Sequence, residues 1–188
     1  MTDILLDRLT QKTDRYQISR AERSLINTAA ALHDIGKITI DDKILNKPGR
    51  LTKEEFDIMK THTLIGAEML DNLDLYRDEP LVKIAYQICR WHHERYDGKG
   101  YPDGLVGDQI PISAQVVSLA DVYAALTSKR GYKDAYPDCS AFNEDDLKKA
   151  IQMIMNGECG VFNPLLLECL LDVESRIQVA MNTLPPPR

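Results

Sequence analysis

Residues 92–102 read HHERYDGKGYP, and the rest of the chain is best interpreted outward from this stretch. Its two adjacent histidines come directly after a run with helical apolar spacing that begins near Pro80, a residue favoured in the first turn of a helix. A glycine-rich loop follows the histidines and continues to Ile110. The stretch therefore places two imidazoles at the end of a predicted helix, beside a loop whose glycines suit unusual backbone angles.

Each of the four histidines lies on a predicted helix or at its end. His33 is followed directly by Asp34, while Asp121 interrupts an apolar stretch in which an unpaired carboxylate would be costly to bury. Imidazole and carboxylate groups are natural ligands of borderline divalent metals, and a carboxylate can bridge two ions. Either histidine pair alone would carry little weight. Together they predict a divalent-metal site built from six residues: His33, Asp34, His62, His92, His93 and Asp121.

The remaining sequence is dominated by helical patterns. Two segments have the spacing of a capping box, in which a serine or threonine is followed three residues later by a glutamate: Ser19 with Glu22, and Thr52 with Glu55. Helices are expected over residues 19–36, 52–70, 80–91, 114–128, 145–155 and 164–181, after a short apolar face at 4–9. Pro111 is well placed for the first turn of the fourth of these.

We expect an all-α fold with residues 1–188 in a single domain, and residues 184–188 as a proline-rich tail. Residues 38–50 are predicted to form a loop, and only the run 38–40 resembles a strand. The length of 188 residues is sufficient for one domain with a substantial core.

Composition narrows the possible functions. The net charge of −6 disfavours broad nucleic-acid binding, although cations near the polar motifs could hold a phosphate ester. No apolar stretch approaches the roughly 20 residues of a membrane span, so no membrane insertion is expected. The first ten residues carry Asp3 and Asp7 where a signal peptide needs an apolar core, so we expect a cytoplasmic protein.

At this point the motifs resemble a known family. Residues 33–37, HDIGK, resemble the signature of the HD phosphohydrolase superfamily, and residues 92–102 match the HHExxDGxGYP signature of its HD-GYP subfamily. Further matching segments follow in order at 44–52, 59–62, 120–123, 126–128 and 130–133. The similarity runs from about residue 25 to about residue 170.

The resemblance implies an HD-type helical bundle of about seven helices. It also implies metal-dependent hydrolysis of cyclic di-GMP to pGpG and GMP, with two divalent ions, usually iron or manganese, as cofactors. In that family pattern, Asp34 bridges two metals, while His62, His92 and His93 complete the shell of one. His33 and Asp121 bind the other.

The resemblance also implies roles beyond metal binding. His33, Asp34 and Lys37 form the catalytic group, and four residues contact the substrate: Lys37, Tyr101, Arg130 and Lys133. The loop that carries Tyr101 is linked to contacts with diguanylate cyclase domains. Domains of this family often follow a phosphorylatable receiver domain, so we expect a bacterial two-component response regulator.

Two departures from the family pattern bear on activity. The family carries a further histidine on a first helix, whereas no histidine precedes His33 here, so we expect an N-terminally incomplete domain with a weakened ion at His33 and Asp121. Ala124 stands where the family usually has aspartate or lysine. Two alternatives therefore stay open: a catalytically weak or inactive module that senses cyclic di-GMP or docks a partner, and a phosphohydrolase of another nucleotide.

Overall fold

The computed structural model describes residues 1–127 and 144–183, and every regular element in them is helical. The α-helices are α1 (Thr2–Lys12), α2 (Arg20–Ala29), α3 (Asp42–Leu45), α4 (Lys53–Asp71), α5 (Pro80–Trp91), α6 (Ile112–Thr127), α8 (Glu144–Met155) and α9 (Pro164–Thr183). Three short 3₁₀ helices, η1 (Ala30–Leu32), η2 (Ile35–Thr39) and η3 (Gly107–Gln109), lie in the connections. The predicted all-α class is confirmed.

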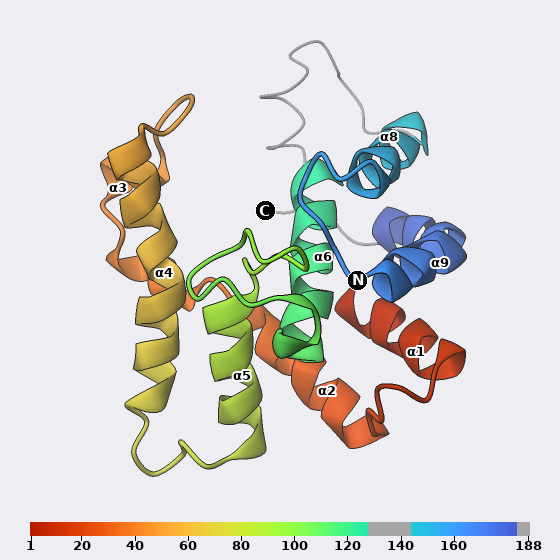
Figure 1. The fold of residues 1–188 in the computed structure, drawn as a ribbon, viewed down its shortest axis with the longest axis horizontal. Helices are drawn as coiled ribbons and strands as arrows, with labels where there is room; N and C mark the ends of the chain where they lie inside the picture. The colour runs from red at the N-terminus through yellow and green to blue at the C-terminus, as the bar shows by residue number, and fades with distance from the viewer. Residues whose placement is uncertain (128–143, 184–188) are drawn as a thin grey trace.

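The helices form a bundle with α6 near its centre (Figure 1). On one side α4 and α5 run antiparallel and pack against each other, and α2 packs against α5. On the other side α1 packs against α9. Helix α6 reads as almost continuously apolar because it contacts both halves, and most of its residues up to Ala120 are buried.

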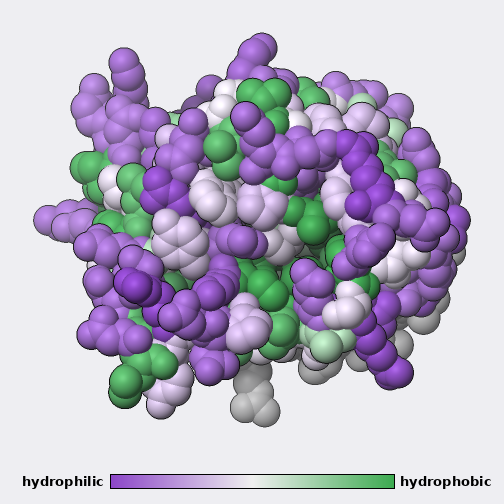
Figure 2. Space-filling model, turned by 60° about the horizontal axis from the view of Figure 1, so that its bottom comes forward, coloured by the Kyte–Doolittle hydropathy of each residue, from purple (hydrophilic) through white to green (hydrophobic). Residues whose placement is uncertain are grey.

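The first helix is part of the core. Leu5, Leu6 and Leu9 are fully buried, and the apolar cluster they join continues through α2, α5, α6 and α9. Figure 2 shows the face at the bottom of Figure 1, where polar side chains cover most of the surface and apolar ones emerge between them in scattered groups. No helix among the described residues has the length and apolar character needed to cross a membrane.

The predicted helix starts are confirmed at the level of hydrogen bonds. The Thr52 hydroxyl accepts from the Glu55 N–H while the Glu55 carboxylate accepts from the Thr52 N–H, so the capping box at the start of α4 is complete. Ser19 caps α2 by accepting from the Glu22 N–H. Pro80 occupies the first turn of α5, as predicted.

The segment between α2 and α4 was predicted less well. Helix α2 ends at Ala29, and Gly36 lies inside η2 instead of ending a long helix. The strand-like run 38–40 is wrong, because Ile38 and Thr39 belong to η2 and the Ile38 side chain is 81% exposed. The short helix α3, which Asp41 caps, interrupts the predicted loop. The predicted tail 184–188 lies outside the described residues.

Candidate metal centre

The structure brings all six predicted ligands into one cluster. His33 and Asp34 lie between η1 and η2, and the other four come from α4, the end of α5, and α6. One ligand atom from each of Asp34, His62, His92 and His93 lies within 4.8 Å of all the others. His33 Nε2 lies 3.3 Å from Asp34 Oδ2 and 3.5 Å from Asp121 Oδ1. The site thus has a histidine-rich half and a half with more carboxylate, which share Asp34.

Backbone carbonyls orient three of the four imidazoles. His33 Nδ1 lies 2.7 Å from the Ala30 oxygen and His62 Nδ1 lies 2.6 Å from the Met59 oxygen. His92 Nδ1 lies 2.9 Å from the Ile88 oxygen. Because a carbonyl oxygen can only accept, each Nδ1 carries the hydrogen and each Nε2 is directed to the cluster. This arrangement is typical of metal-binding histidines.

A glycine contact explains why Asp34 approaches His62 so closely. A Cβ built on Gly36 would lie 2.0 Å from the His62 carbonyl oxygen and 2.7 Å from the Gly66 nitrogen, so η2 lies directly against the backbone of α4. Only glycine permits such an approach. As a result, Asp34 Oδ1 lies 3.4 Å from the His62 Nε2 atom.

The donor atoms fit a divalent cation. His62 Nε2 and His92 Nε2 face each other at 3.5 Å, and with both Nδ1 atoms protonated, two lone pairs point into the same space. His33 Nε2 and Asp34 Oδ1 are buried without a hydrogen-bond partner among the described residues. Buried polar atoms of this kind are costly unless a positive charge, either a metal ion or a proton on His33, lies between them.

The protonation states of the cluster also favour a metal site. Burial, together with the charge of His33, lowers the pKa of His92 to about 4, and burial and His92 lower the pKa of His93 to about 3. Both rings are therefore neutral, as a metal ligand must be. Burial alone would lower the pKa of His33, but the carboxylates of Asp121 and Asp34 outweigh it and raise that pKa to about 10. Without a metal, a proton on His33 supplies the positive charge.

The cluster is open on one side. His62 and His92 are 1% exposed, whereas the Asp34, Lys37 and Asp121 side chains are about a third exposed. Burial would raise the pKa of Asp34, but His33 and Lys37 outweigh it and keep this pKa below its usual range; Lys37 Nζ lies 2.6 Å from Asp34 Oδ2. The exposed side of the cluster is therefore the side on which the Lys37 ammonium group lies.

The other predicted substrate contacts have different outcomes. The Tyr101 ring stacks on the His93 ring with 4.8 Å between centroids, which places it beside the cluster. Arg130 and Lys133 lie outside the described residues. Ala124 is exposed on α6, three residues beyond Asp121.

Glu94 has a function that the sequence alone did not reveal. It could have been a direct partner of a histidine ligand, but its carboxylate instead accepts three backbone N–H groups of the loop that follows, at Asp103, Gly104 and Leu105. The available signal was an acid placed immediately before a glycine-rich loop, which has many free N–H groups to satisfy.

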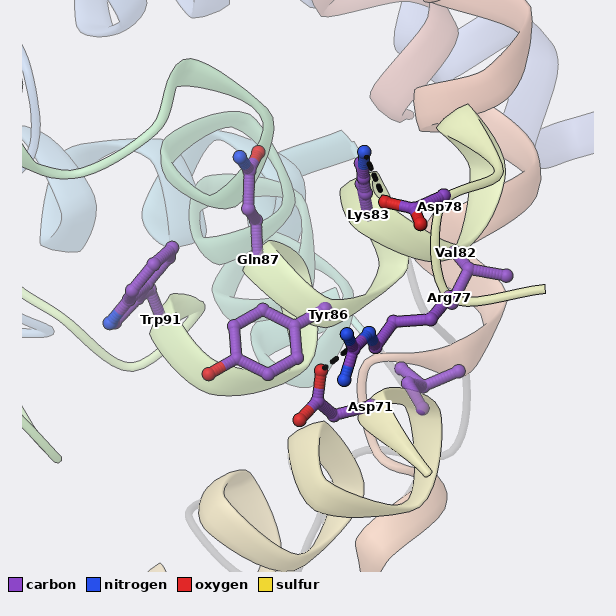
Figure 3. Close-up of a pocket in the computed structure, with 9 residues that line it drawn as sticks. Asp71, Arg77, Asp78, Val82, Lys83, Tyr86, Gln87 and Trp91 are labelled. Atoms are coloured by element: carbon purple, nitrogen blue, oxygen red, sulfur yellow. Dashed lines mark ion pairs between the residues drawn. The ribbon is translucent and has the colours of Figure 1, made fainter. Parts of the chain in front are cut away.

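A pocket lies beside α5 and is separate from the candidate site (Figure 3). Its volume is about 320 Å³, and it is lined by Leu70, Asp71, Arg77, Asp78, Val82, Lys83, Tyr86, Gln87 and Trp91. Its cations already have partners, since Arg77 pairs with Asp71 and Lys83 with Asp78. None of the predicted metal or substrate residues in the described part of the chain lines it.

Comparison with known proteins identifies the family of the chain. The HD domain family model matches residues 7–149. The chain is 46% identical over 123 residues to the cyclic di-GMP phosphodiesterase response regulator RpfG of Xanthomonas campestris, a match that covers 65% of this chain and 32% of the relative. It is 43% identical over 152 residues to a cyclic di-GMP phosphodiesterase of Thermotoga maritima, covering 81% of this chain and 38% of the relative.

Another relative has a different named substrate. The chain is 38% identical over 157 residues to 3'3'-cGAMP-specific phosphodiesterase 2 of Vibrio cholerae, covering 84% of this chain and 28% of the relative. In all three cases the chain spans less than two fifths of the relative. The relatives named as cyclic di-GMP phosphodiesterases bear out the resemblance to the HD-GYP subfamily, and the family model settles the wider assignment: the chain belongs to the HD domain family.

Proposed function

We propose that this domain is a metal-dependent phosphodiesterase that hydrolyses cyclic di-GMP to pGpG and GMP. The observation that carries the proposal is the cluster of four histidines and two aspartates, in which three histidines direct Nε2 inward and the two carboxylates are about a third exposed. The relatives named as cyclic di-GMP phosphodiesterases support this choice of substrate. The fold and the site together favour hydrolysis over a purely structural bundle, because such a bundle would leave the buried His33 Nε2 and Asp34 Oδ1 atoms, which have no hydrogen-bond partner in the described part of the chain, without a reason.

Two ions would be held by the six ligands. His62, His92, His93 and Asp34 would hold one, and His33, Asp121 and Asp34 the other, with iron or manganese as the metal. When bound, divalent ions in such a site neutralise developing charge on a phosphoryl group and lower the pKa of water. We expect the second ion to be held more weakly, because the described residues offer it only one imidazole.

The surrounding residues would bind and orient the substrate. Lys37 lies at the open side of the cluster and can turn its ammonium from Asp34 to a phosphate oxygen, because its side chain is only partly buried. Arg130 and Lys133 are proposed as further phosphate contacts, and Tyr101 as an aromatic surface beside His93. Together these groups place a phosphodiester against the metal ligands and supply positive charge as the bond to the leaving oxygen breaks.

A second candidate substrate is 3'3'-cGAMP, because a relative is named for it. It shares the two phosphodiester links of a cyclic dinucleotide and differs in one base. In the proposed arrangement the cluster would contact phosphate and not bases, so the described site fits both dinucleotides. Base discrimination would have to come from residues farther from the metals.

We also propose a cellular context. One relative is named as a response regulator, and this supports a cytoplasmic signalling protein in which the domain is joined to a receiver domain. The loop that carries Tyr101 is the proposed contact for a diguanylate cyclase domain. A phosphorylation-dependent change in hydrolysis by the full-length protein would test this context.

The test is an anaerobic hydrolysis assay with Mn(II) or Fe(II), in which cyclic di-GMP and 3'3'-cGAMP are compared side by side. Linear product from the unmodified chain, and none from His92→Ala, supports the phosphodiesterase. The ratio of the two rates identifies the preferred substrate. Binding of cyclic di-GMP without turnover by the metal-loaded chain would refute the enzyme and favour a sensing module.

A further inference from the structure

Glu94 is a buried carboxylate that serves the backbone of a loop. It is 4% exposed, and no lysine or arginine among the described residues pairs with it. Its Oε1 accepts from the N–H groups of Asp103 at 2.7 Å and Gly104 at 3.0 Å, and its Oε2 accepts from Leu105 at 3.1 Å. A carboxylate that accepts several backbone N–H groups fixes the backbone that donates to it.

The same loop is held from its other side by α5. The Asp103 carboxylate accepts from Arg90 Nε at 2.8 Å and Nη2 at 2.9 Å, and from Trp91 Nε1 at 2.7 Å. A Cβ on Gly100 would lie 2.3 Å from the Arg95 nitrogen, so the loop also lies directly against the backbone beside Glu94. Residues 100–105 are thus fixed to the segments on both sides of the histidine pair.

This loop carries the group that contacts His93. The Tyr101 N–H donates to the His93 carbonyl at 3.2 Å, and the two rings are stacked with an interplanar angle of 25°. The side chains of the other three histidines donate to backbone carbonyls. His93 makes no side-chain hydrogen bond to any residue that the structure describes, so ring packing orients it. The Tyr101 ring stacks on it, and the His92 and His62 rings lie with their centroids 4.1 Å and 5.2 Å away.

We propose that Glu94 is a positioning residue for His93: by holding residues 103–105 it keeps Tyr101 stacked on the imidazole and so presents His93 Nε2 or Nδ1 to the cluster. The effect on metal binding rests on the proposed metal site. The effect on ring orientation does not, because it is a property of the metal-free protein.

The first test is nuclear magnetic resonance of the metal-free chain. Four histidines give few ring signals, and His93→Gln identifies the signal of interest. The stacked Tyr101 ring should shift the His93 ring protons upfield. Glu94→Ala removes all three acceptor contacts and should abolish this shift, and Glu94→Gln, which keeps one carbonyl oxygen, should reduce it. An unchanged His93 shift in Glu94→Ala would overturn the proposal.

The second test measures Mn(II) binding by titration with electron paramagnetic resonance detection of the free ion. Loss of an outer partner of a ligand typically weakens metal binding about 10- to 100-fold, and we expect this for Glu94→Ala, with a smaller loss for Glu94→Gln. Tyr101→Leu should weaken Mn(II) binding by about the same factor. The double variant Glu94→Gln with Tyr101→Leu should then lose no more Mn(II) affinity than Tyr101→Leu alone, because both substitutions act through the contact between Tyr101 and His93.

The control for a general loss of stability is Leu6→Ala. Leu6 is fully buried on α1, where it joins the apolar core and carries no contact to the loop. It should destabilise the fold without changing Mn(II) affinity or the His93 shift. Equal losses in Leu6→Ala and Glu94→Ala, or additive losses in the double variant, would overturn the positioning role. If the unmodified chain binds no Mn(II), the proposed metal function fails, and the metal-free spectra still decide the orientation of His93.

Discussion

Gly36 sets the distance between η2 and α4, and Gly36→Ala is the sharpest test of how the site is built. The added Cβ would lie 2.0 Å from the His62 carbonyl oxygen, and the segment would have to withdraw by about 1.4 Å to reach the 3.4 Å of ordinary contact. The obstructing atoms are backbone and cannot rotate away. Overpacking usually costs about 1–3 kcal/mol, and we expect the free energy of unfolding to fall by about 3 kcal/mol here.

The same withdrawal would damage the metal site. Asp34 lies two residues before Gly36, and its Oδ1 is 3.4 Å from His62 Nε2, so this distance would increase to about 4.8 Å. A displacement of about 1 Å can lower a catalytic rate by about 100-fold, and we expect a loss of that size in hydrolysis, together with weaker Mn(II) binding. Urea unfolding, metal titration and the hydrolysis assay measure the three effects separately.

Two other glycines provide matched controls. A Cβ on Gly66 would lie 3.1 Å from the Gly36 nitrogen, a tight but smaller overlap, and alanine gains about 1 kcal/mol within a helix, so Gly66→Ala should be nearly neutral. Gly49 has a φ of +100° with nothing near its Cβ position, so Gly49→Ala should cost about 1–2 kcal/mol and leave Mn(II) binding intact. The reasoning is refuted if Gly36→Ala retains both the stability and the Mn(II) affinity of the unmodified chain.

Three further predictions concern the metals and the core. Mn(II) at about 100 times its dissociation constant should raise the free energy of unfolding, measured by urea denaturation, by about 2.7 kcal/mol. His62→Ala should remove this gain. Stabilisation by Mn(II) that persists in the variant would place the ion elsewhere. The pKa of His33 is about 10 without metal, so binding of the ion at His33 should release about one proton at pH 8. The affinity for this ion should therefore rise about tenfold per pH unit from pH 7 to 9. Calorimetry in several buffers measures the proton release, and its absence would contradict that pKa. Leu6→Ala should lower the free energy of unfolding by about 2–5 kcal/mol, whereas Asp172→Asn should lower it by less than about 1 kcal/mol despite the ion pairs of Asp172 with α1. If thermal unfolding ranks the two variants the other way, ion pairs and not apolar packing hold α1 to α9.

The sequence predicted which residues form the cluster better than it predicted how they are arranged. All four histidines could be assigned to one site because few residue types bind such metals and the chain has no other histidine. Their proximity depends on the contact between Gly36 and Gly66, which spacing along the chain does not encode. The available signal was Gly66 in the interior of a predicted helix, since an interior glycine is costly without a packing reason.

Short elements were beyond the reach of pattern analysis. Helix α3 has four residues, too few for a helical period to show, and the Asp41 side chain that accepts from the Lys43 N–H starts it by a local hydrogen bond. The run 38–40 was misread because three residues cannot distinguish a strand from a 3₁₀ turn. By contrast, the capping box at Thr52 was predicted correctly because its two hydrogen bonds are local in sequence.

The contacts within residues 92–102 give a physical reason for the contiguity of that stretch. The segment folds back on itself, so Gly100 lies against the Arg95 backbone and the next residue, Tyr101, stacks on His93. Position 94 must therefore supply an acceptor, position 100 must lack a Cβ, and position 101 must carry a flat ring. Lys99 is subject to none of these requirements, because its side chain is exposed and only its N–H bonds within the loop, to Asp97. Lys99→Ala should consequently leave the His93 ring shift and Mn(II) affinity unchanged, although it lies within the same signature.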